Sequence, residues 1–291
     1  MSMTSVLALA TILTAPDAPP PRRPVVVTTD SGTDADDQWA LAHLALAPEV
    51  DLKGVVTTHA PNLAAPAAET AARSARAILD KFGVDPKRPV LAGSSRPLTD
   101  PPKALPNAGV DFLIESSRGR GPDDRLTVVV IGPATDVASA LLVDPSLADR
   151  IAVVAMAFHD WPDGGDPWNV NNDVRAWRIL LESRTPIVNG DDAVCRRKLM
   201  LSIPQARALL GEPGRPLVAL LEGRSADWAI WDEVAVAAIL GYAKIERRPR
   251  PSLRDDATFD HARPAGTIDW IVDVDADRLW ADLAAKLSRR R

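Results

Sequence analysis

Cysteine and tyrosine are nearly absent from this chain of 291 residues, which contains one of each. The single cysteine, Cys195, excludes an intramolecular disulfide and a metal site built from several cysteines. Cysteine content therefore does not indicate whether the protein works in an oxidising or a reducing compartment. No apolar run approaches the roughly 20 residues that a membrane-spanning helix needs. A basic excess is also missing, because the net charge is −5. The sequence therefore argues against a membrane protein and against a nucleic-acid partner.

The N-terminal segment has two interpretations. Residues 6–13 (VLALATIL) are short and apolar like the core of a signal peptide, but no Lys or Arg precedes them. A Pro-rich stretch without a clean cleavage site follows. We therefore expect residues 1–23 to lie outside the fold, as a flexible leader or a signal segment, and localisation stays open between the cytoplasm and export. Residues 24–291 are expected to form a single domain.

From Pro24 onward, short runs rich in Val and Ile alternate with longer amphipathic stretches. Strands are expected at residues 24–29, 52–58, 90–92, 126–131, 151–155, 187–188 and 267–274. Helices are expected at 36–47, 64–82, 132–142, 173–183, 204–210, 217–222, 230–242 and 276–286, and loops at 97–109 and 160–168. Apolar strands that alternate with helices predict an α/β fold with a mainly parallel central sheet and helices on both faces.

Polar residues follow three of these strands, at Asp30, at residues 57–62 and at Ile131-Gly132. In open α/β sheets, ligands bind beyond the carboxyl ends of the strands. We therefore expect the functional site at this edge of the sheet.

The stretch DSGTDADD at residues 30–37 holds four carboxylates, those of Asp30, Asp34, Asp36 and Asp37. Like charges this close together are costly unless a cation offsets them. Hard divalent cations such as Ca²⁺ and Mg²⁺ take oxygen ligands. An acidic loop with helix capping by Asp36 and Asp37 is the structural alternative, but capping explains one or two acids rather than four. The stretch therefore favours a metal site.

This stretch resembles the aspartate cluster of the inosine–uridine preferring nucleoside hydrolases, in the longer form DxGTDxDD. Three further stretches resemble segments of that family in the same order. Residues 56–62 (VTTHAPN) are similar to the family's TTxxGN segment. Residues 130–138 (VIGPATDVA) are similar to its segment in which a strand leads through GPLTN into a helix. Residues 231–237 (WDEVAVA) are similar to its HDPxAVA segment. The likeness spans residues 24 to about 280 and implies a nucleoside hydrolase-like catalytic domain with Rossmann-like topology.

The resemblance implies one Ca²⁺ ion, held by the side chains of Asp30, Asp37 and Asp232 and by the main-chain oxygen of Ile131. Asp34 has no counterpart in the shorter form of the motif and could be a further ligand. Water and the 2′- and 3′-hydroxyls of a ribose would complete the coordination.

The same resemblance makes Asp36 the general base, which activates a calcium-bound water for attack on C1′. The implied reaction is hydrolysis of the N-glycosidic bond of a ribonucleoside to free base and ribose, a step of purine or pyrimidine salvage. The implied partner is a small nucleoside, and relatives are often homodimers or homotetramers.

Six residues are implied in substrate binding. Asn62 and Asn169 would hydrogen-bond the ribose, and Asp166 could replace a Glu of the family at the 5′-hydroxyl. Trp231 stands where the family has His, so a leaving-group acid is lost there, and either stacking on the base or packing is the expected role. Trp168 and His59 are the remaining candidates for contact with the nucleoside.

Two other functions fit parts of the sequence. The missing His and Glu suit a metal-containing nucleoside- or sugar-binding protein that has lost catalysis. DSGTD is also loosely similar to the DxDGT start of Mg²⁺-dependent phosphatases that use an aspartate nucleophile.

Overall fold

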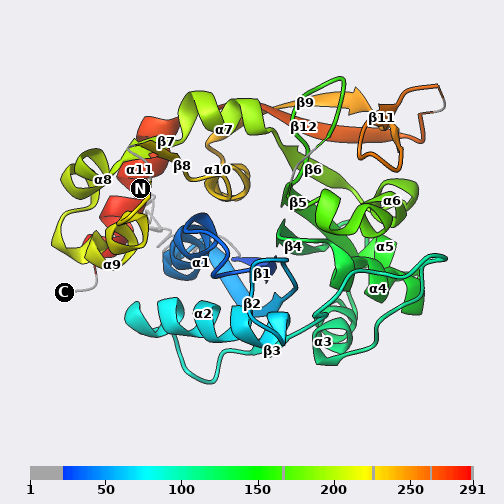
Figure 1. The fold of residues 1–291 in the computed structure, drawn as a ribbon, viewed down its shortest axis with the longest axis horizontal. Coiled ribbons are helices and arrows are strands. Elements are labelled where there is room, and N and C mark those ends of the chain that lie inside the picture. Colours follow the sequence, from blue (N-terminus) through cyan, green and yellow to red (C-terminus); the bar gives the residue numbers. More distant parts are fainter. Residues whose placement is uncertain (1–21, 166–167, 225–226, 263, 290–291) are drawn as a thin grey trace, which may run out of the picture.

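The computed structural model describes residues 22–289 except 166–167, 225–226 and 263. Residues 1–21 of the predicted leader therefore lie outside the described chain, whereas Arg23 already begins the first strand. Figure 1 shows a central sheet with helices packed around it. Among the described residues, no helix has the length and apolar character that crossing a membrane requires.

Eight strands form the main sheet, in the order β3-β2-β1-β4-β5-β6-β12-β9. Their bounds are β1 Arg23–Thr29, β2 Val50–Thr57, β3 Val90–Ala92, β4 Leu126–Ile131, β5 Ile151–Met156, β6 Ile187–Gly190, β9 Ala243–Pro249 and β12 Thr267–Val274. All neighbouring pairs are parallel except β12 and β9, which pair antiparallel at the edge. The predicted mainly parallel sheet is confirmed, and the first six strands follow the Rossmann order.

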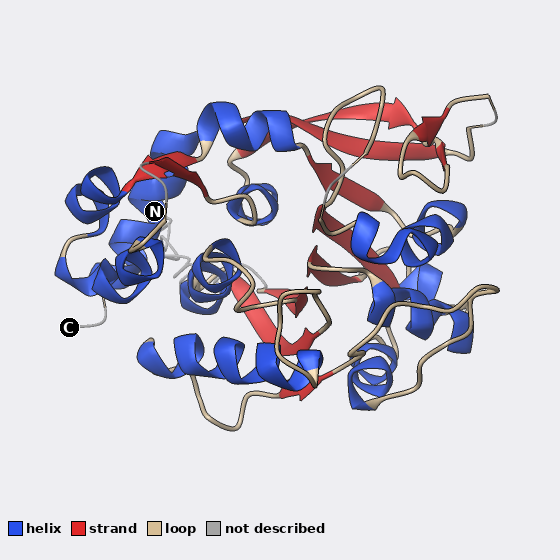
Figure 2. Cartoon of the chain, in the orientation of Figure 1, coloured by secondary structure: helices blue, strands red, loops and turns tan. Residues whose placement is uncertain are grey.

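Helices cover both faces of the sheet, as the sequence predicts (Figure 2). One face packs against α1 Asp36–Leu46, α2 Ala67–Lys81, α10 Glu233–Leu240 and α11 Ala276–Ser288. The other packs against α3 Ala108–Ser116, α4 Thr135–Val143 and α6 Val174–Glu182. Shorter helices are α5 Leu147–Arg150, α7 Asp192–Lys198, α8 Ile203–Leu210 and α9 Arg215–Val218. Two small antiparallel pairs complete the fold, β7 Met200–Ser202 with β8 Asp227–Ala229 and β10 Ser252–Leu253 with β11 Phe259–Asp260.

The middle of strand β1 is apolar because both faces of the strand are buried. Val25 and Val27 belong to the core on one side of the sheet, and Val26 belongs to the core on the other side. A strand that is buried on both faces has no solvent-facing position for a polar side chain. The strand therefore reads as a continuous Val run that ends in polar residues only where it leaves the sheet.

Several predicted boundaries were wrong. Residues 108–109, predicted as loop, begin α3, which continues to Ser116. The helix predicted at 230–242 begins only at Glu233, after Asp232, and the one predicted at 217–222 is the end of α9 followed by a 3-10 turn at Ala219–Leu221. Strand β9 and helix α7 were not predicted.

The strand order places β1 between β2 and β4. The chain leaves β1 toward one side of the sheet and later enters β4 on the other side, so the two strands flank the topological switch point. Asp30 follows β1 directly, and Ile131 ends β4. The fold therefore sets these two residues next to each other at the edge where ligands bind in such sheets.

Candidate active site

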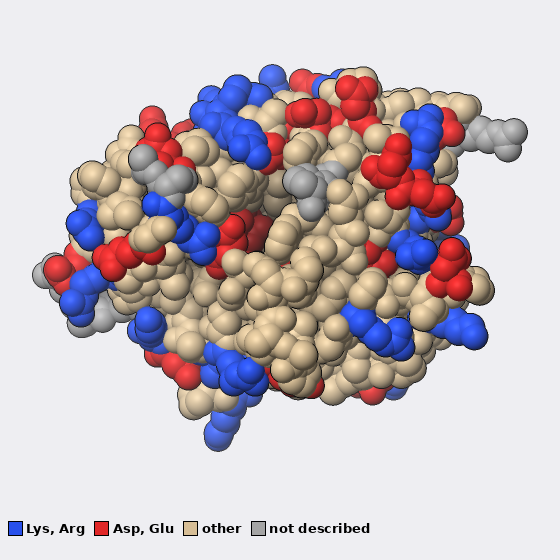
Figure 3. Space-filling view, viewed as in Figure 1, with Lys and Arg blue, Asp and Glu red and all other residues tan. Residues whose placement is uncertain are grey.

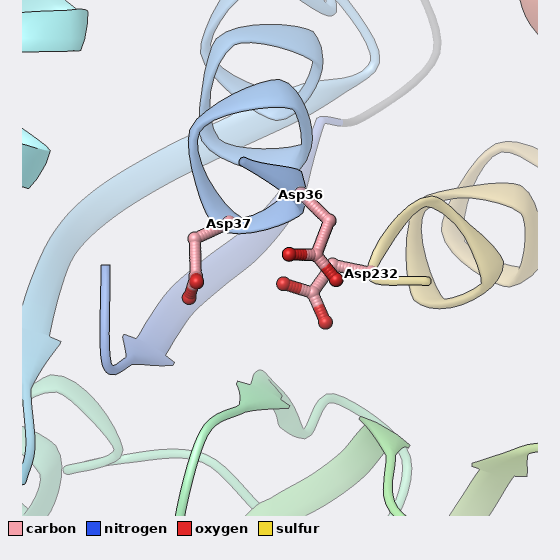
Figure 4. A group of neighbouring side chains, drawn as sticks. All are labelled: Asp36, Asp37 and Asp232. Atoms are coloured by element: carbon pink, nitrogen blue, oxygen red, sulfur yellow. The ribbon is translucent and has the colours of Figure 1, made fainter. Parts of the chain in front are cut away.

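Three buried carboxylates meet beside the carboxyl end of β1. Asp36 and Asp37 lie in the first turn of α1, and Asp232 lies just before α10, almost 200 positions along the chain (Figure 4). One oxygen from each of these carboxylates lies within 4.8 Å of the others. This buried acidic group could hold a metal ion, and it includes the predicted ligands Asp37 and Asp232 and the predicted base Asp36.

Local contacts fix the first turn of α1. No side chain caps this helix, so capping does not account for Asp36 and Asp37. The Asp37 carboxylate accepts a hydrogen bond from the Thr29 hydroxyl at the end of β1. A Cβ at Gly132 would lie 2.7 Å from the backbone nitrogen of Asp30, so only glycine lets β4 pass this close to the acidic loop.

The charges in this group are strongly perturbed. Burial, and then the nearby Asp34 carboxylate, raises the pKa of Asp36 to about 8. Burial also raises the pKa of Asp37, with the Asp30 charge as the next cause. The pKa of Asp232 is raised in the same way, by burial and by Asp36. These carboxylates resist ionisation because their negative charges repel one another, and a bound cation would reduce that repulsion.

The carboxylates lie inside a cavity of about 390 Å³, a size suited to a small molecule. Figure 3 shows acidic atoms within a hollow on this face of the protein. Its lining includes most of the predicted site residues: Asp30, Asp34, Asp36, Asp37, Asn62, Ile131, Trp168, Asn169, Trp231 and Asp232. Segments from five places along the chain therefore converge on one cavity.

Two of the acidic residues are engaged by neighbours. Trp168 Nε1 donates a hydrogen bond of 3.0 Å to Asp30 Oδ2. Asp34 accepts a hydrogen bond of 2.7 Å from the backbone N–H of Ala35 and forms an ion pair with Arg224. Neither Asp30 nor Asp34 belongs to the group of three carboxylates, and the predicted role of Asp34 as a possible further ligand stays a prediction.

The two predicted ribose-binding amides differ in their surroundings. Asn169 is buried, and its Nδ2 donates to the Met156 carbonyl at 2.9 Å. Its Oδ1 is also buried and has no hydrogen-bond partner among the described residues, so it is available to a ligand hydroxyl in the cavity. Asn62 is exposed at the rim, with a long contact of 3.5 Å to the Thr33 carbonyl.

Among the described residues, one predicted substrate contact, His59, does not line the cavity. His59 is buried, and its Nε2 lies 3.0 Å from the Thr135 hydroxyl, which in turn donates to Asp173 at 2.7 Å. Burial lowers the pKa of His59. It is not among the lining residues of the described chain, and its predicted contact with the nucleoside stays a prediction. Asp166 lies outside the described residues.

The cavity is also lined by residues beyond the predicted ligands, base and substrate contacts. Met156 ends β5 and His159 follows it, whereas Asp192 and Arg196 lie on α7 directly after β6. The rule that ligands bind beyond strand carboxyl ends would have found these positions, had α7 been predicted. Trp231 Nε1 donates to Asp192 Oδ1 at 2.5 Å, so α7 and the segment before α10 form one wall.

Comparison with known sequences identifies the family. Residues 25–281 match the family model of the inosine-uridine preferring nucleoside hydrolases. A protein of Schizosaccharomyces pombe is 32% identical over 191 residues, which cover 56% of this chain and 59% of the relative. The pyrimidine-specific ribonucleoside hydrolase RihA of Salmonella enteritidis is 25% identical over 226 residues, 68% of this chain and 70% of its own.

Solved structures share the fold. The purine-preferring ribonucleoside hydrolase of Gardnerella vaginalis superposes with a TM-score of 0.73 at 23% identity, covering 92% of this chain and 98% of that one. The inosine-uridine preferring nucleoside hydrolase of Bacillus anthracis gives 0.72 at 19% identity, with 92% and 99% covered. The predicted α/β fold and the predicted class of N-ribosyl hydrolase enzymes are confirmed at the level of the family. Because the family model spans nearly all of the described sheet and the acidic group, the chain belongs to the inosine-uridine preferring nucleoside hydrolase family.

Proposed function

We propose that this protein hydrolyses the N-glycosidic bond of a ribonucleoside, with calcium as its cofactor and Asp36 as the general base. The observation that carries the proposal is the meeting of Asp36, Asp37 and Asp232 within 4.8 Å at the wall of a cavity of about 390 Å³. A cavity of this size accommodates a small ligand such as a nucleoside.

The donor set fits a hard divalent cation. It consists of carboxylate oxygens, which Ca²⁺ and Mg²⁺ prefer over nitrogen or sulfur ligands. Asp37 and Asp232 would hold the ion with Asp30 and the main-chain oxygen of Ile131, all of which line the cavity. When bound, Ca²⁺ would offset the carboxylate charges, fix the vicinal hydroxyls of the sugar and lower the pKa of water.

Asp36 is suited to accept a proton. Without a cation, burial and the Asp34 carboxylate raise the pKa of Asp36 to about 8. A bound Ca²⁺ would lower this pKa, so that Asp36 is ionised near neutral pH and still retains affinity for a proton. In the proposed reaction, Asp36 takes a proton from the water that attacks C1′ as the bond from C1′ to the base nitrogen breaks. The departing base keeps the bonding electron pair and is protonated from solvent. The transition state gains oxocarbenium character, as in other glycoside hydrolysis.

Asn169 and Trp168 would orient the sugar. The unpartnered Oδ1 of Asn169 can accept a hydrogen bond from a hydroxyl of the ligand, and its Nδ2 is fixed by the Met156 carbonyl. Trp168 covers one side of the cavity while its indole N–H holds Asp30 in place. Both residues therefore favour one orientation of the ligand relative to the carboxylates.

The direct test incubates purified protein and calcium with a panel of purine and pyrimidine ribonucleosides and measures free ribose and free base. We expect both products in equal amounts from at least one nucleoside, and release slowed by about 10²- to 10⁴-fold from Asp36→Asn. Tight nucleoside binding without product would instead favour the binding protein without catalysis. Release of phosphate from a generic phosphoester would favour the aspartate-nucleophile phosphatase.

A further inference from the structure

One wall of the cavity is organised around Asp192. Its Oδ1 accepts the 2.5 Å hydrogen bond from Trp231 Nε1, and its Oδ2 accepts a 2.7 Å hydrogen bond from Arg196 Nε. The Arg196 guanidinium carbon also lies over the Trp231 ring, 5.5 Å from the ring centroid. A carboxylate that is only 10% exposed thus holds an indole and a guanidinium in a fixed relation.

Arg196 keeps its terminal donors free. Its only hydrogen bond within the described chain uses Nε, so neither Nη is engaged there, and its side chain is 59% exposed. The residue lines the same cavity as the carboxylates. The wall also adjoins them in sequence, because Trp231 directly precedes Asp232. A sugar bound at the carboxylates therefore has its base within the same cavity as these free N–H groups.

We propose that Arg196 is a specificity-determining residue that recognises the base of a 6-oxopurine ribonucleoside, with Asp192 and Trp231 positioning it. This inference rests on the proposed function. Arginine offers donors and no acceptor. A 6-oxopurine presents two adjacent acceptors, O6 and N7, in the spacing that two guanidinium N–H groups match. Adenine presents an amino donor in place of O6, so donor would face donor.

The position of the guanidinium also changes the expected role of Trp231. Arg196 lies over the ring of Trp231, and Trp228 packs edge-on against it with centroids 5.6 Å apart. Its indole N–H is used by Asp192. Trp231 therefore acts on the base through Arg196, as a platform that restricts where the guanidinium can lie.

The test compares inosine with adenosine in wild type, Arg196→Met and Arg196→Lys. Arg197→Met is the matched control, because Arg197 lies on the same helix but binds the carbonyls of Ala193 and Val272 outside the cavity lining. We expect wild type to favour inosine in kcat/KM. Arg196→Met should lower kcat/KM for inosine by about 10-fold or more and change adenosine little. The kcat/KM of Arg196→Lys for inosine should lie between those of wild type and Arg196→Met, and Arg197→Met should have the kcat/KM of wild type.

A second readout measures binding of free hypoxanthine and free adenine by calorimetry with the same proteins. Wild type should bind hypoxanthine more tightly than adenine, and Arg196→Met should lose that preference. A preference for adenine, or an equal loss for both bases in Arg196→Met, would overturn the inference while leaving hydrolysis intact. No hydrolysis of any nucleoside would overturn the proposed function, and the calorimetry would still decide whether Arg196 reads the base.

Discussion

Replacing Asp232 by Asn should make the metal-free protein more stable and abolish its response to calcium. The carboxylates of Asp36, Asp37 and Asp232 lie within 4.8 Å of one another. At an effective dielectric constant of about 20, two unit charges at this separation repel by about 3 kcal/mol. Asp232→Asn removes two of the three repulsive pairs. Protonation of Asp36, whose pKa is about 8, already relieves part of this repulsion near neutral pH. We therefore expect a gain of roughly 1–3 kcal/mol at pH 8 without metal.

Calcium should stabilise wild type and leave the stability of Asp232→Asn unchanged. For a site with a Kd of about 10 µM, 1 mM Ca²⁺ adds about 2.7 kcal/mol to the free energy of unfolding. In a domain of this size that corresponds to a rise in Tm of roughly 5–10 °C. Wild type should show this rise in Tm and Asp232→Asn should not, so calcium should reduce or reverse the stability advantage of Asp232→Asn.

The assay is thermal unfolding of both proteins after chelation and again in 1 mM Ca²⁺. Asp255→Asn serves as the control, because this carboxylate is 96% exposed and pairs only with Arg178 among the described residues. It should respond to calcium like wild type. The reasoning would be refuted if metal-free Asp232→Asn were less stable than wild type and gained as much from calcium.

Three further outcomes follow from the same structure. Asp36→Asn should lower kcat by about 10²- to 10⁴-fold and keep the calcium-induced rise in Tm; loss of both would make Asp36 a ligand rather than the base. Asn169→Ala should lower kcat/KM by about 10-fold in steady-state kinetics, and an unchanged value would remove Asn169 from the substrate site. His43 is buried between Glu233 and Asp282, at 2.8 and 2.9 Å. Despite its burial, these carboxylates raise the pKa of His43 above 6.5, so its stabilising charge is present at low pH and is lost as pH rises through the raised value. Urea unfolding should show His43→Gln destabilised by about 2 kcal/mol at pH 6 and by less at pH 9, and a pH-independent difference would contradict this.

The order of elements could be predicted because the buried strands carry an unmistakable pattern. Strand β1 is apolar at successive positions since both of its faces are covered, and β4 follows the same rule. Strand β9 was missed for the opposite reason. It lies at the edge of the sheet, and its sequence AKIERRP is mostly charged, so its pairing with β12 leaves no apolar run to detect.

The acidic half of the site was predictable and the wall opposite was not. The stretch DSGTDADD concentrates negative charge in a few adjacent residues, which indicates a cation site. The segment around Asp232 matches a family motif, so it could also be found in the sequence. Asp192 and Arg196 lie in a seven-residue helix with the sequence DAVCRRK, which reads as an ordinary exposed turn. Their place in the cavity wall depends on the hydrogen bond between Asp192 and Trp231, which lie 39 positions apart. No pattern in the sequence predicts that contact.

The sequence did not indicate the orientation of the His59 side chain, for a related reason. A histidine in a loop after a strand resembles a ligand contact, but packing against Thr135 turned this side chain into the interior. Sequence indicates which strand end a residue follows, and the orientation of the side chain is decided by the neighbours it packs against.

The most direct measurement of the central claim is a calcium titration of metal-stripped protein with ribose release from the best nucleoside as the readout. The account predicts no release without metal and a rise that saturates at one calcium ion per chain, with Asp37→Asn and Asp232→Asn inactive at the same concentrations. Full ribose release in the presence of a chelator would contradict it.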